Sequence, residues 1–154
     1  MAEEPHMAGE ARMVDVAGKQ ETRRRAVAAA RLRMRPETAD LVARAALPKG
    51  DALAVARVAG ILGAKRTADL LPLCHPLPLT SVLVDFEVGE DFIEVVATVE
   101  TFARTGVEME ALTAAALAAL SIYDMAKGVD REMEVAWMGL VEKAGGRSGK
   151  FVRG

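Results

Sequence analysis

The segment from Val107 to Lys127 constrains the fold most, because it predicts a long helix with very few polar positions. At about 100° per residue, one side carries an ordinary core face, and much of the remaining surface is apolar as well. The core side comprises Val107, Ala111, Ala114, Ala118, Ile122, Met125 and Val129, and the far side Leu112, Ala116, Ala119, Leu120 and Tyr123. One small sheet cannot bury both sides. We therefore expect a second subunit on the far side, which predicts a homo-oligomer.

A β-hairpin is predicted just before this helix. Apolar residues alternate through 82–88 and again through 93–99, and Gly89-Glu90-Asp91 forms the turn between the two runs. The rest of the chain predicts a strand over 24–34, a short helix from Pro36 to Pro48, a longer helix from Asp51 to Pro72 and a last strand over 133–143.

The resulting order, β-α-α-β-β-α-β, is typical of an α+β, ferredoxin-like antiparallel sheet packed with helices, with one extra helix. Residues 1–12 are polar and lack periodicity, so we expect a flexible N-terminal arm. Residues 13–154 contain no internal repeat or linker, so we expect them to form a single domain.

Composition argues against a nucleic-acid or membrane partner. The 154 residues carry a net charge of −2 and only 4% aromatic side chains, so a basic field and a base-stacking surface are both lacking. The single cysteine cannot form an intramolecular disulfide, and nothing resembles a signal peptide. The apolar stretch near 111–122 is too short to span a bilayer. We therefore expect a cytoplasmic protein.

The only cysteine, Cys74, precedes His75 between two prolines, where no helix can continue. A closed zinc site needs four ligands, and Cys74, His75 and His6 are the whole cysteine and histidine supply. A Cys-His dyad is disfavoured, because neighbouring side chains on an extended segment point to opposite sides. Two interpretations stay open: a core cysteine beside a half-exposed histidine, or a stiff loop that presents His75 and backbone amides to a ligand.

Three polar residues stand out on the long helix. Glu110 and Asp124 lie within about 40° of each other around the axis, and Lys127 follows Asp124 by one turn. A surface ion pair worth a few tenths of a kcal/mol is one interpretation. The other is functional, since charges beside a buried helix must be paired or must line a cavity.

Cations recur beside glycines in this chain. Lys49-Gly50-Asp51 and the tail Gly145-Gly146-Arg147-Ser148-Gly149-Lys150 combine positive charge with residues that allow close backbone approach. That combination suits phosphate groups, although the P-loop pattern GxxxxGK[ST] is absent.

Several short motifs, taken in order, resemble the MoaC family, the cyclic pyranopterin monophosphate synthases of molybdenum cofactor biosynthesis. They are MVDV at Met13, KGD at Lys49, AGI near Gly60, LCHPL at Leu73, TGVEMEALTAA at Thr105, YDM-K at Tyr123 and the GG-SG tail. The resemblance covers about Met13 to Phe151, and the ordered set is highly specific although each motif alone is weak.

The resemblance implies a ferredoxin-like subunit in a hexamer, a trimer of dimers, with active sites between subunits. The implied substrate is (8S)-3′,8-cyclo-7,8-dihydroguanosine 5′-triphosphate, and the products are cyclic pyranopterin monophosphate and pyrophosphate. Such a lyase reaction needs proton transfers but no electron carrier. No cofactor is required, and Mg²⁺ is able to accompany the triphosphate.

The resemblance also implies roles for individual residues. Asp124 corresponds to the catalytic aspartate and Lys127 to the lysine beside it. Substrate contacts are implied for Leu73, Cys74, His75, Met109 and Glu110, and for three basic residues that hold the polyphosphate or assist the chemistry, Arg24, Lys49 and Lys143. One departure is visible: the chain has DMAKG where the family has DMCKA, which leaves every ionisable candidate in place. The competing hypothesis is a non-catalytic, oligomeric nucleotide-sensing module, since a fold does not fix a function.

Overall fold

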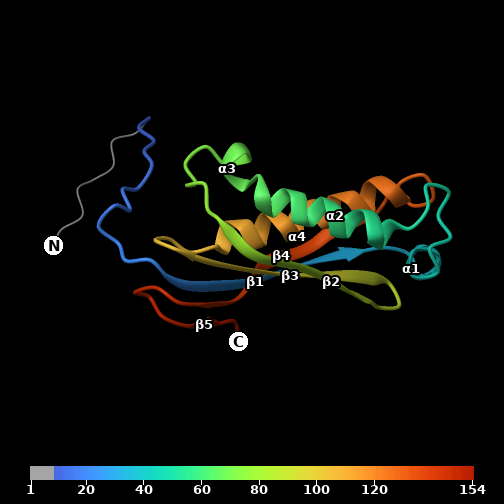
Figure 1. The fold of residues 1–154 in the computed structure, drawn as a ribbon. Helices are drawn as coiled ribbons and strands as arrows, with labels where there is room; N and C mark the ends of the chain where they lie inside the picture. The colour runs from blue at the N-terminus through green and yellow to red at the C-terminus, as the bar shows by residue number, and fades with distance from the viewer. Residues whose placement is uncertain (1–8) are drawn as a thin grey trace.

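A computed structural model describes residues 9–154 and contains one five-stranded sheet in the order β2-β3-β1-β4-β5. Every neighbouring pair of strands is antiparallel. The helices α2 and α4 cover one face of the sheet (Figure 1). The elements are β1 (Thr22–Arg33), α1 (Pro36–Ala43), α2 (Ala52–Lys65), α3 (Thr67–Leu70), β2 (Leu79–Val88), β3 (Phe92–Ala103), α4 (Glu108–Ala126), β4 (Glu134–Ala144) and β5 (Phe151–Val152).

The predicted hairpin is confirmed as β2 and β3. Alternate residues of β3 are buried along nearly its whole length, as expected for a strand with one face against a core. The turn closes with the amide of Gly89 donating to the carbonyl of Phe92 at 2.8 Å. The predicted α+β class and the antiparallel pairing are therefore both confirmed.

Small side chains in β1 let the helices pack closely on the middle of the sheet. Ala28, Ala30 and Leu32 are fully buried, and the strand predicted over 24–34 is confirmed as β1. β1 lies between β3 and β4, so it has no free edge. A central strand of alanines leaves little side-chain volume between sheet and helix.

The long predicted helix is confirmed as α4, but its core side packs against another helix as well as against the sheet. α2 of the same chain approaches α4 closely at Gly60, whose nearest α4 neighbours are Ala114 and Ala118 of the predicted core side. A Cβ on Gly60 would lie 3.0 Å from the carbonyl oxygen of Ala114, so only glycine fits there without a shift. What remains uncovered is a narrower row, in which Leu120 is 57% exposed and Met109 40% exposed.

α4 is long and apolar enough to span a membrane, judged by length and composition alone. The helix extends beyond the apolar stretch near 111–122 on which the sequence prediction was based. Half of its most apolar window is buried inside the domain. The core helix of a globular protein meets the same two criteria, so the match is weak evidence for a membrane span.

Two helix boundaries differ from the sequence prediction. The short helix predicted from Pro36 to Pro48 ends at Ala43, and the helix predicted from Asp51 to Pro72 ends at Lys65, with α3 after it as a separate short turn. The cap predicted at Asp51 is confirmed, since Asp51 Oδ1 accepts from the amide of Ala54 at 3.2 Å. Beyond the C-terminal end of α2, the side-chain hydroxyl of Thr67 donates to the carbonyls of Gly63 and Ala64, where a continuing helix would use backbone amides. β5 was not predicted; it adds two residues at the β4 edge.

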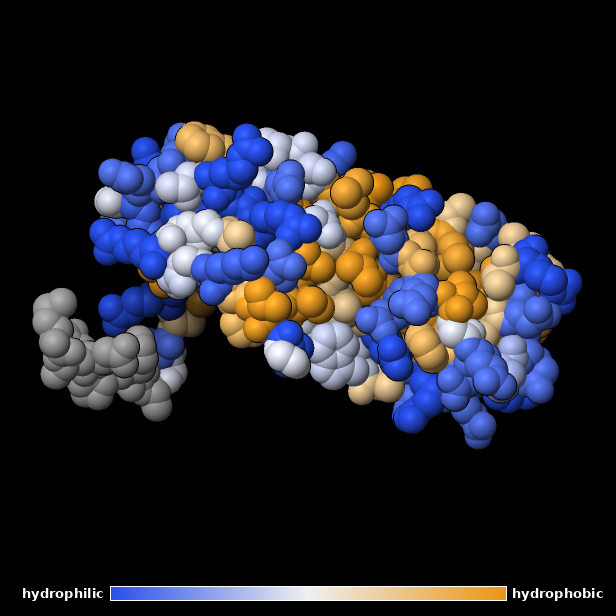
Figure 2. All heavy atoms as spheres, turned by 90° about the horizontal axis from the view of Figure 1, so that it is seen from below, coloured by the Kyte–Doolittle hydropathy of each residue, from blue (hydrophilic) through white to orange (hydrophobic). Residues whose placement is uncertain are grey.

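The sheet face opposite the helices is apolar in its middle and polar toward its ends (Figure 2). Leu83, Phe102 and Trp137 are among its exposed residues, at 56%, 55% and 38%. Ion pairs flank them, including Arg31 with Glu94 at 2.5 Å.

Of the arm predicted for 1–12, residues 1–8, and with them His6, lie outside the described residues. Residues 9–12 are exposed and belong to no helix or strand.

Candidate active site

A cavity of about 740 Å³ forms where three segments meet at one end of the sheet. The segments are the start of β1 with the residues before it, the turn before α4, and the end of β4 with the glycine-rich tail. Four positive side chains line this cavity, which is here called the cationic cavity: Lys19, Arg24, Lys143 and Arg147. Such a concentration of cations in a concave site suits a polyphosphate.

Backbone carbonyls fix the position of Arg24 in the cationic cavity. Its Nε donates to the carbonyl of Ala103 at 3.2 Å, and Nη2 donates to the carbonyl of Arg104 at 3.1 Å. Gly146 lies directly against the same guanidinium group, and a Cβ there would overlap Nη1. Gly146 has a φ of +79°, which favours glycine for a second reason.

Two further groups make the cationic cavity suitable for a ligand. The side chain of Lys143 is only 19% exposed and lies 3.6 Å from the carboxylate of Glu108, and it also donates to Ser148. Thr22 Oγ1 lines the same cavity and is the one buried side-chain polar atom without a hydrogen-bond partner among residues 9–154. A buried hydroxyl without a partner is costly, so a ligand oxygen there would stabilise it.

A smaller cavity of about 230 Å³ adjoins the first and is here called the Cys-His cavity. The two cavities share Lys19, Thr105, Gly106 and Glu108. The Cys-His cavity brings together five residues predicted from the sequence: Leu73, Cys74, His75, Met109 and Glu110. Arg24 and Lys143 line the adjoining cationic cavity, so seven of the predicted residues lie in one continuous region.

Cys74 and His75 both line the Cys-His cavity, and the prediction that their side chains do not form a dyad stays a prediction. The segment is not extended at its start: the amide of Cys74 donates to the carbonyl of Leu71 at 3.1 Å and closes a turn. Burial, and next the negative charge of Glu110, raise the pKa of the Cys74 thiol. A thiol that resists ionisation is a poor nucleophile.

Glu110 is the most buried carboxyl group of the Cys-His cavity, at 4% exposed. Burial raises the pKa of Glu110, and the nearby charge of Glu108 acts in the same direction. Protonated, it donates a hydrogen bond; ionised, it accepts one. A buried carboxyl group with a raised pKa suits proton exchange with a ligand.

Asp124, Lys127 and Lys49 form a separate group at the C-terminal end of α4. Lys127 Nζ lies 3.0 Å from Asp124 Oδ1, and Lys49 Nζ lies 3.5 Å from Asp124 Oδ2. The hydrogen bond and the charge of Lys127, followed by the charge of Lys49, lower the pKa of Asp124. All three side chains are more than half exposed.

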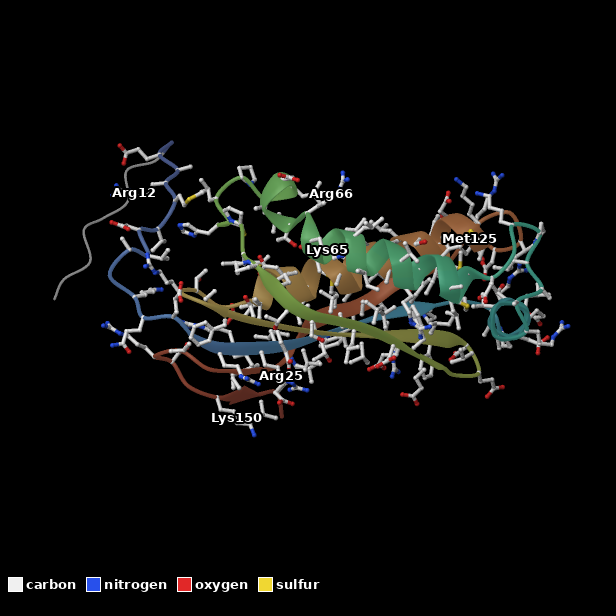
Figure 3. All side chains as sticks on the ribbon, in the orientation of Figure 1. Arg12, Arg25, Lys65, Arg66, Met125 and Lys150 are labelled. Carbon is white, nitrogen blue, oxygen red and sulfur yellow. The ribbon has the colours of Figure 1, made fainter. Side chains whose placement is uncertain are left out.

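Within one chain this trio lies far from the two cavities. Glu110 and Asp124 are 14 residues apart in the same helix, which corresponds to about 21 Å. They lie on similar sides of the axis, as predicted, but Glu110 is buried in the domain while Asp124 is exposed. Met125, which follows Asp124, lies near α1, at the opposite end of the molecule from Arg12 (Figure 3).

Sequence reasoning missed Lys19 and Glu108, which line both cavities. A signal for Lys19 was present, because Gly18-Lys19 pairs a glycine with a cation as Lys49-Gly50 does. Glu108 has no such signal, since a glutamate in the first turn of a helix is common for structural reasons alone. Among the described residues, no group of three or more His, Cys, Asp or Glu side chains is placed to hold a metal ion.

Comparison with known proteins identifies the family of this chain. A model of the MoaC family matches residues 13–146, which is most of the chain. The chain belongs to the MoaC family. Its MoaC relatives include the cyclic pyranopterin monophosphate synthase of Thermomicrobium roseum, 60% identical over 99% of this chain and 95% of the relative. The protein of that name from Roseiflexus sp. strain RS-1 is 58% identical over 94% of this chain and 92% of its own length.

Similarity extends to relatives of lower identity. The cyclic pyranopterin monophosphate synthase of Streptomyces avermitilis is 53% identical over 95% of this chain and 86% of its own length. The matched region of the MoaC model includes both cavities up to Gly146 and the Asp124 trio.

Proposed function

We propose that this chain is a cyclic pyranopterin monophosphate synthase, a lyase of molybdenum cofactor biosynthesis. It converts (8S)-3′,8-cyclo-7,8-dihydroguanosine 5′-triphosphate to cyclic pyranopterin monophosphate and pyrophosphate. The observation that carries this proposal is the pair of adjoining cavities, one cationic and one lined by Cys74, His75 and Glu110. A nucleoside triphosphate has the matching division into an anionic chain and a polar ring system. The names of the relatives support the same reaction.

The triphosphate occupies the cationic cavity in this proposal. Arg24 and Lys143 hold its oxygens, with Lys19 and Arg147 on the cavity wall. Closure of the cyclic phosphate requires a hydroxyl to attack the α-phosphorus while pyrophosphate leaves. Fixed cations stabilise the negative charge that develops on the leaving oxygens. No resident cofactor is needed for this step, and any Mg²⁺ would arrive bound to the triphosphate.

The ring system occupies the Cys-His cavity in this proposal. Leu73 and Met109 supply apolar contacts, and His75 and Glu110 supply hydrogen bonds to the ring nitrogens and carbonyl. Conversion of a purine to a pterin requires ring opening and several proton transfers. Glu110 suits such transfers because burial raises its pKa toward neutrality.

Asp124 and Lys127 carry the remaining proton transfers, and Lys49 assists them. A carboxylate and an ammonium group 3.0 Å apart form a base and an acid in contact. The position of Lys49 beside Asp124 favours a part in the chemistry over a part in holding the polyphosphate.

This scheme requires Asp124 of one chain to reach the cavities of another, so we propose a homo-oligomer with active sites between subunits. A row of residues on α4, here called the α4 stripe, leads from the Cys-His cavity to Asp124: Met109, Leu112, Ala116, Leu120 and Tyr123. In a two-fold interface, residue i of one copy meets j of the other, and j meets i. Antiparallel packing along the α4 stripe therefore brings the Asp124 end of one helix to the Glu110 end of the other.

A ferredoxin-like subunit in a hexamer, a trimer of dimers, fits the remaining features. The order β2-β3-β1-β4 and the connections through α1–α3 and α4 support the ferredoxin-like plan. A trimer of dimers needs two different interfaces. The described part of the chain exposes two separate apolar surfaces that would serve, the helix layer with the α4 stripe and the open face of the sheet (Figure 2). We further propose that this assembly works in the cytoplasm.

The direct test supplies the cyclised GTP intermediate to the purified protein and measures pterin product and pyrophosphate. Wild-type protein should release both in equal amounts, and Asp124→Ala should keep the wild-type oligomer while losing product formation. Near-normal turnover by Asp124→Ala would contradict the assignment of that residue. Binding of GTP that changes assembly, with no turnover of the cyclised substrate, would favour the nucleotide-sensing alternative instead.

A further inference from the structure

Asp130 is a buried carboxylate that belongs to neither cavity. It lies in the loop between α4 and β4 and is 4% exposed. Its Oδ2 accepts from the hydroxyl of Thr38 at 2.9 Å and from the amide of Arg35 at 3.0 Å, and its Oδ1 accepts from the amide of Glu132 at 3.2 Å. Burial alone would raise the pKa of Asp130, but these hydrogen bonds and the charge of Arg35 outweigh it and lower the pKa. The carboxylate is therefore ionised and fully engaged.

The hydrogen bonds of Asp130 join the start of α1 to the end of α4. α1 has no side-chain cap of its own at its N-terminus, and Asp130 supplies an acceptor there from another part of the chain. The guanidinium of Arg35 adds a second link, because it donates to the carbonyl of Val129. An eight-residue helix is not stable by itself, so contacts of this kind fix its position.

The other end of α1 leads to Lys49. The loop after α1 is closed by a bridge between Leu47 and Gly50, and Lys49 projects from this loop. Its Nζ lies 3.2 Å from the carbonyl oxygen of Asp124 and 3.5 Å from the carboxylate oxygen Oδ2. Both ends of α1 are therefore linked to the C-terminal end of α4, the start through Asp130 in the loop after α4 and the far end through Lys49 in the loop after α1.

We propose that Asp130 is a positioning residue, which holds α1 against the end of α4 so that Lys49 stays within reach of Asp124. The expected effect of Asp130 on kcat rests on the proposed function. Its expected effect on the position of Lys49 beside Asp124 does not. Asp130 touches no cavity residue and acts only through the segments that it joins. Its loss should therefore affect the chemical step and leave substrate binding in the cationic cavity intact.

The kinetic test compares Asp130→Ala with Asp130→Asn and with Asp40→Asn as a matched control. Asp40 is an exposed aspartate of α1 that pairs only with Arg44. We expect Asp130→Ala to lower kcat by about 10- to 100-fold with KM within about twofold of wild type. Asp130→Asn should lose less, since its amide oxygen still accepts from Thr38. Asp40→Asn should match wild type. An unchanged kcat in Asp130→Ala would overturn the proposal, as would a parallel rise of KM.

A second measurement does not depend on turnover. The pKa of Asp124 is lowered first by Lys127 and then by Lys49, and carboxyl NMR titration reports it directly. If Asp130 positions Lys49, Asp130→Ala should raise the pKa of Asp124 in the same direction as Lys49→Ala does, and by a smaller amount. A wild-type midpoint in Asp130→Ala would overturn the proposal even if the enzyme assay failed. If Asp130→Ala does not fold, Thr38→Val replaces it, because this variant removes one of the hydrogen bonds to Asp130. Thr38→Val should then lower kcat and raise the pKa of Asp124, each by less than Asp130→Ala would. The absence of both changes would refute the positioning role of Asp130.

Discussion

Replacement of Gly146 by alanine should weaken substrate binding by displacing Arg24. Gly146 has a φ of +79°, so any Cβ costs about 1–2 kcal/mol of folding free energy. The same Cβ would overlap Arg24 Nη1, so the guanidinium must leave its hydrogen bonds to the carbonyls of Ala103 and Arg104. A hydrogen bond to a charged group contributes about 1.5–3 kcal/mol. If one such bond to the triphosphate is lost, KM should rise roughly 10- to 150-fold.

Gly149 offers a matched control in the same tail. Its φ is +65°, but nothing lies within 4 Å of where its Cβ would be. Gly149→Ala should therefore lose a similar free energy of unfolding while keeping the wild-type KM. Steady-state kinetics with the cyclised substrate and denaturant unfolding measure the two effects. Equal KM values for Gly146→Ala and Gly149→Ala, with both proteins folded, would refute the placement of Arg24 in the phosphate site.

Two further predictions separate chemistry, binding and stability. Lys49→Ala should lower kcat by about 10²–10⁴-fold with little change in KM, whereas Lys143→Ala should mainly raise KM. Steady-state assays measure both variants. The reverse pattern would contradict the place of Lys49 in the chemical step and of Lys143 in the phosphate site. Burial raises the pKa of Glu110, so the unfolded chain ionises this carboxyl at a lower pH than the folded chain. Stability from Glu110 is therefore complete below its ordinary pKa of 4.5 and falls as pH rises toward the raised value. Glu110→Gln should unfold at a higher temperature than wild type at pH 7, and the difference should vanish in acid; a constant difference at all pH values would exclude a raised pKa.

Much of the fold could be predicted from local sequence patterns. The hairpin was predictable because the alternation over 82–88 and 93–99 is interrupted only by Gly89-Glu90-Asp91. The division of the helix after Asp51 was not predictable, because Thr67 ends the pattern through a side-chain hydrogen bond that composition does not reveal. The cover of α4 by α2 also depends on a tertiary contact, at Gly60, which sequence spacing leaves open.

Seven residues of the two cavities could be named from the sequence motifs, but Lys19, Glu108 and the distance between the cavities and Asp124 could not. The motif residues Leu73 to His75 and Met109 with Glu110 meet in one cavity, as their resemblance to a family implied. Helical periodicity placed Glu110 and Asp124 at similar angles and did not reveal that one is buried and the other exposed. Distance along the axis, about 21 Å, separates them within one chain, so the proposed shared site requires a second copy of the chain.

The most direct test of this shared site mixes two inactive variants, Asp124→Ala and His75→Ala, by joint unfolding and refolding. Each variant alone should form oligomers without activity. If each site takes Asp124 from one chain and His75 from another, a mixed pair contains one intact site and one doubly altered site. Random mixing then predicts recovery of about a quarter of wild-type activity in the pyrophosphate assay. If both residues act within one chain, no intact site forms, and mixtures as inactive as the separate variants would contradict the account.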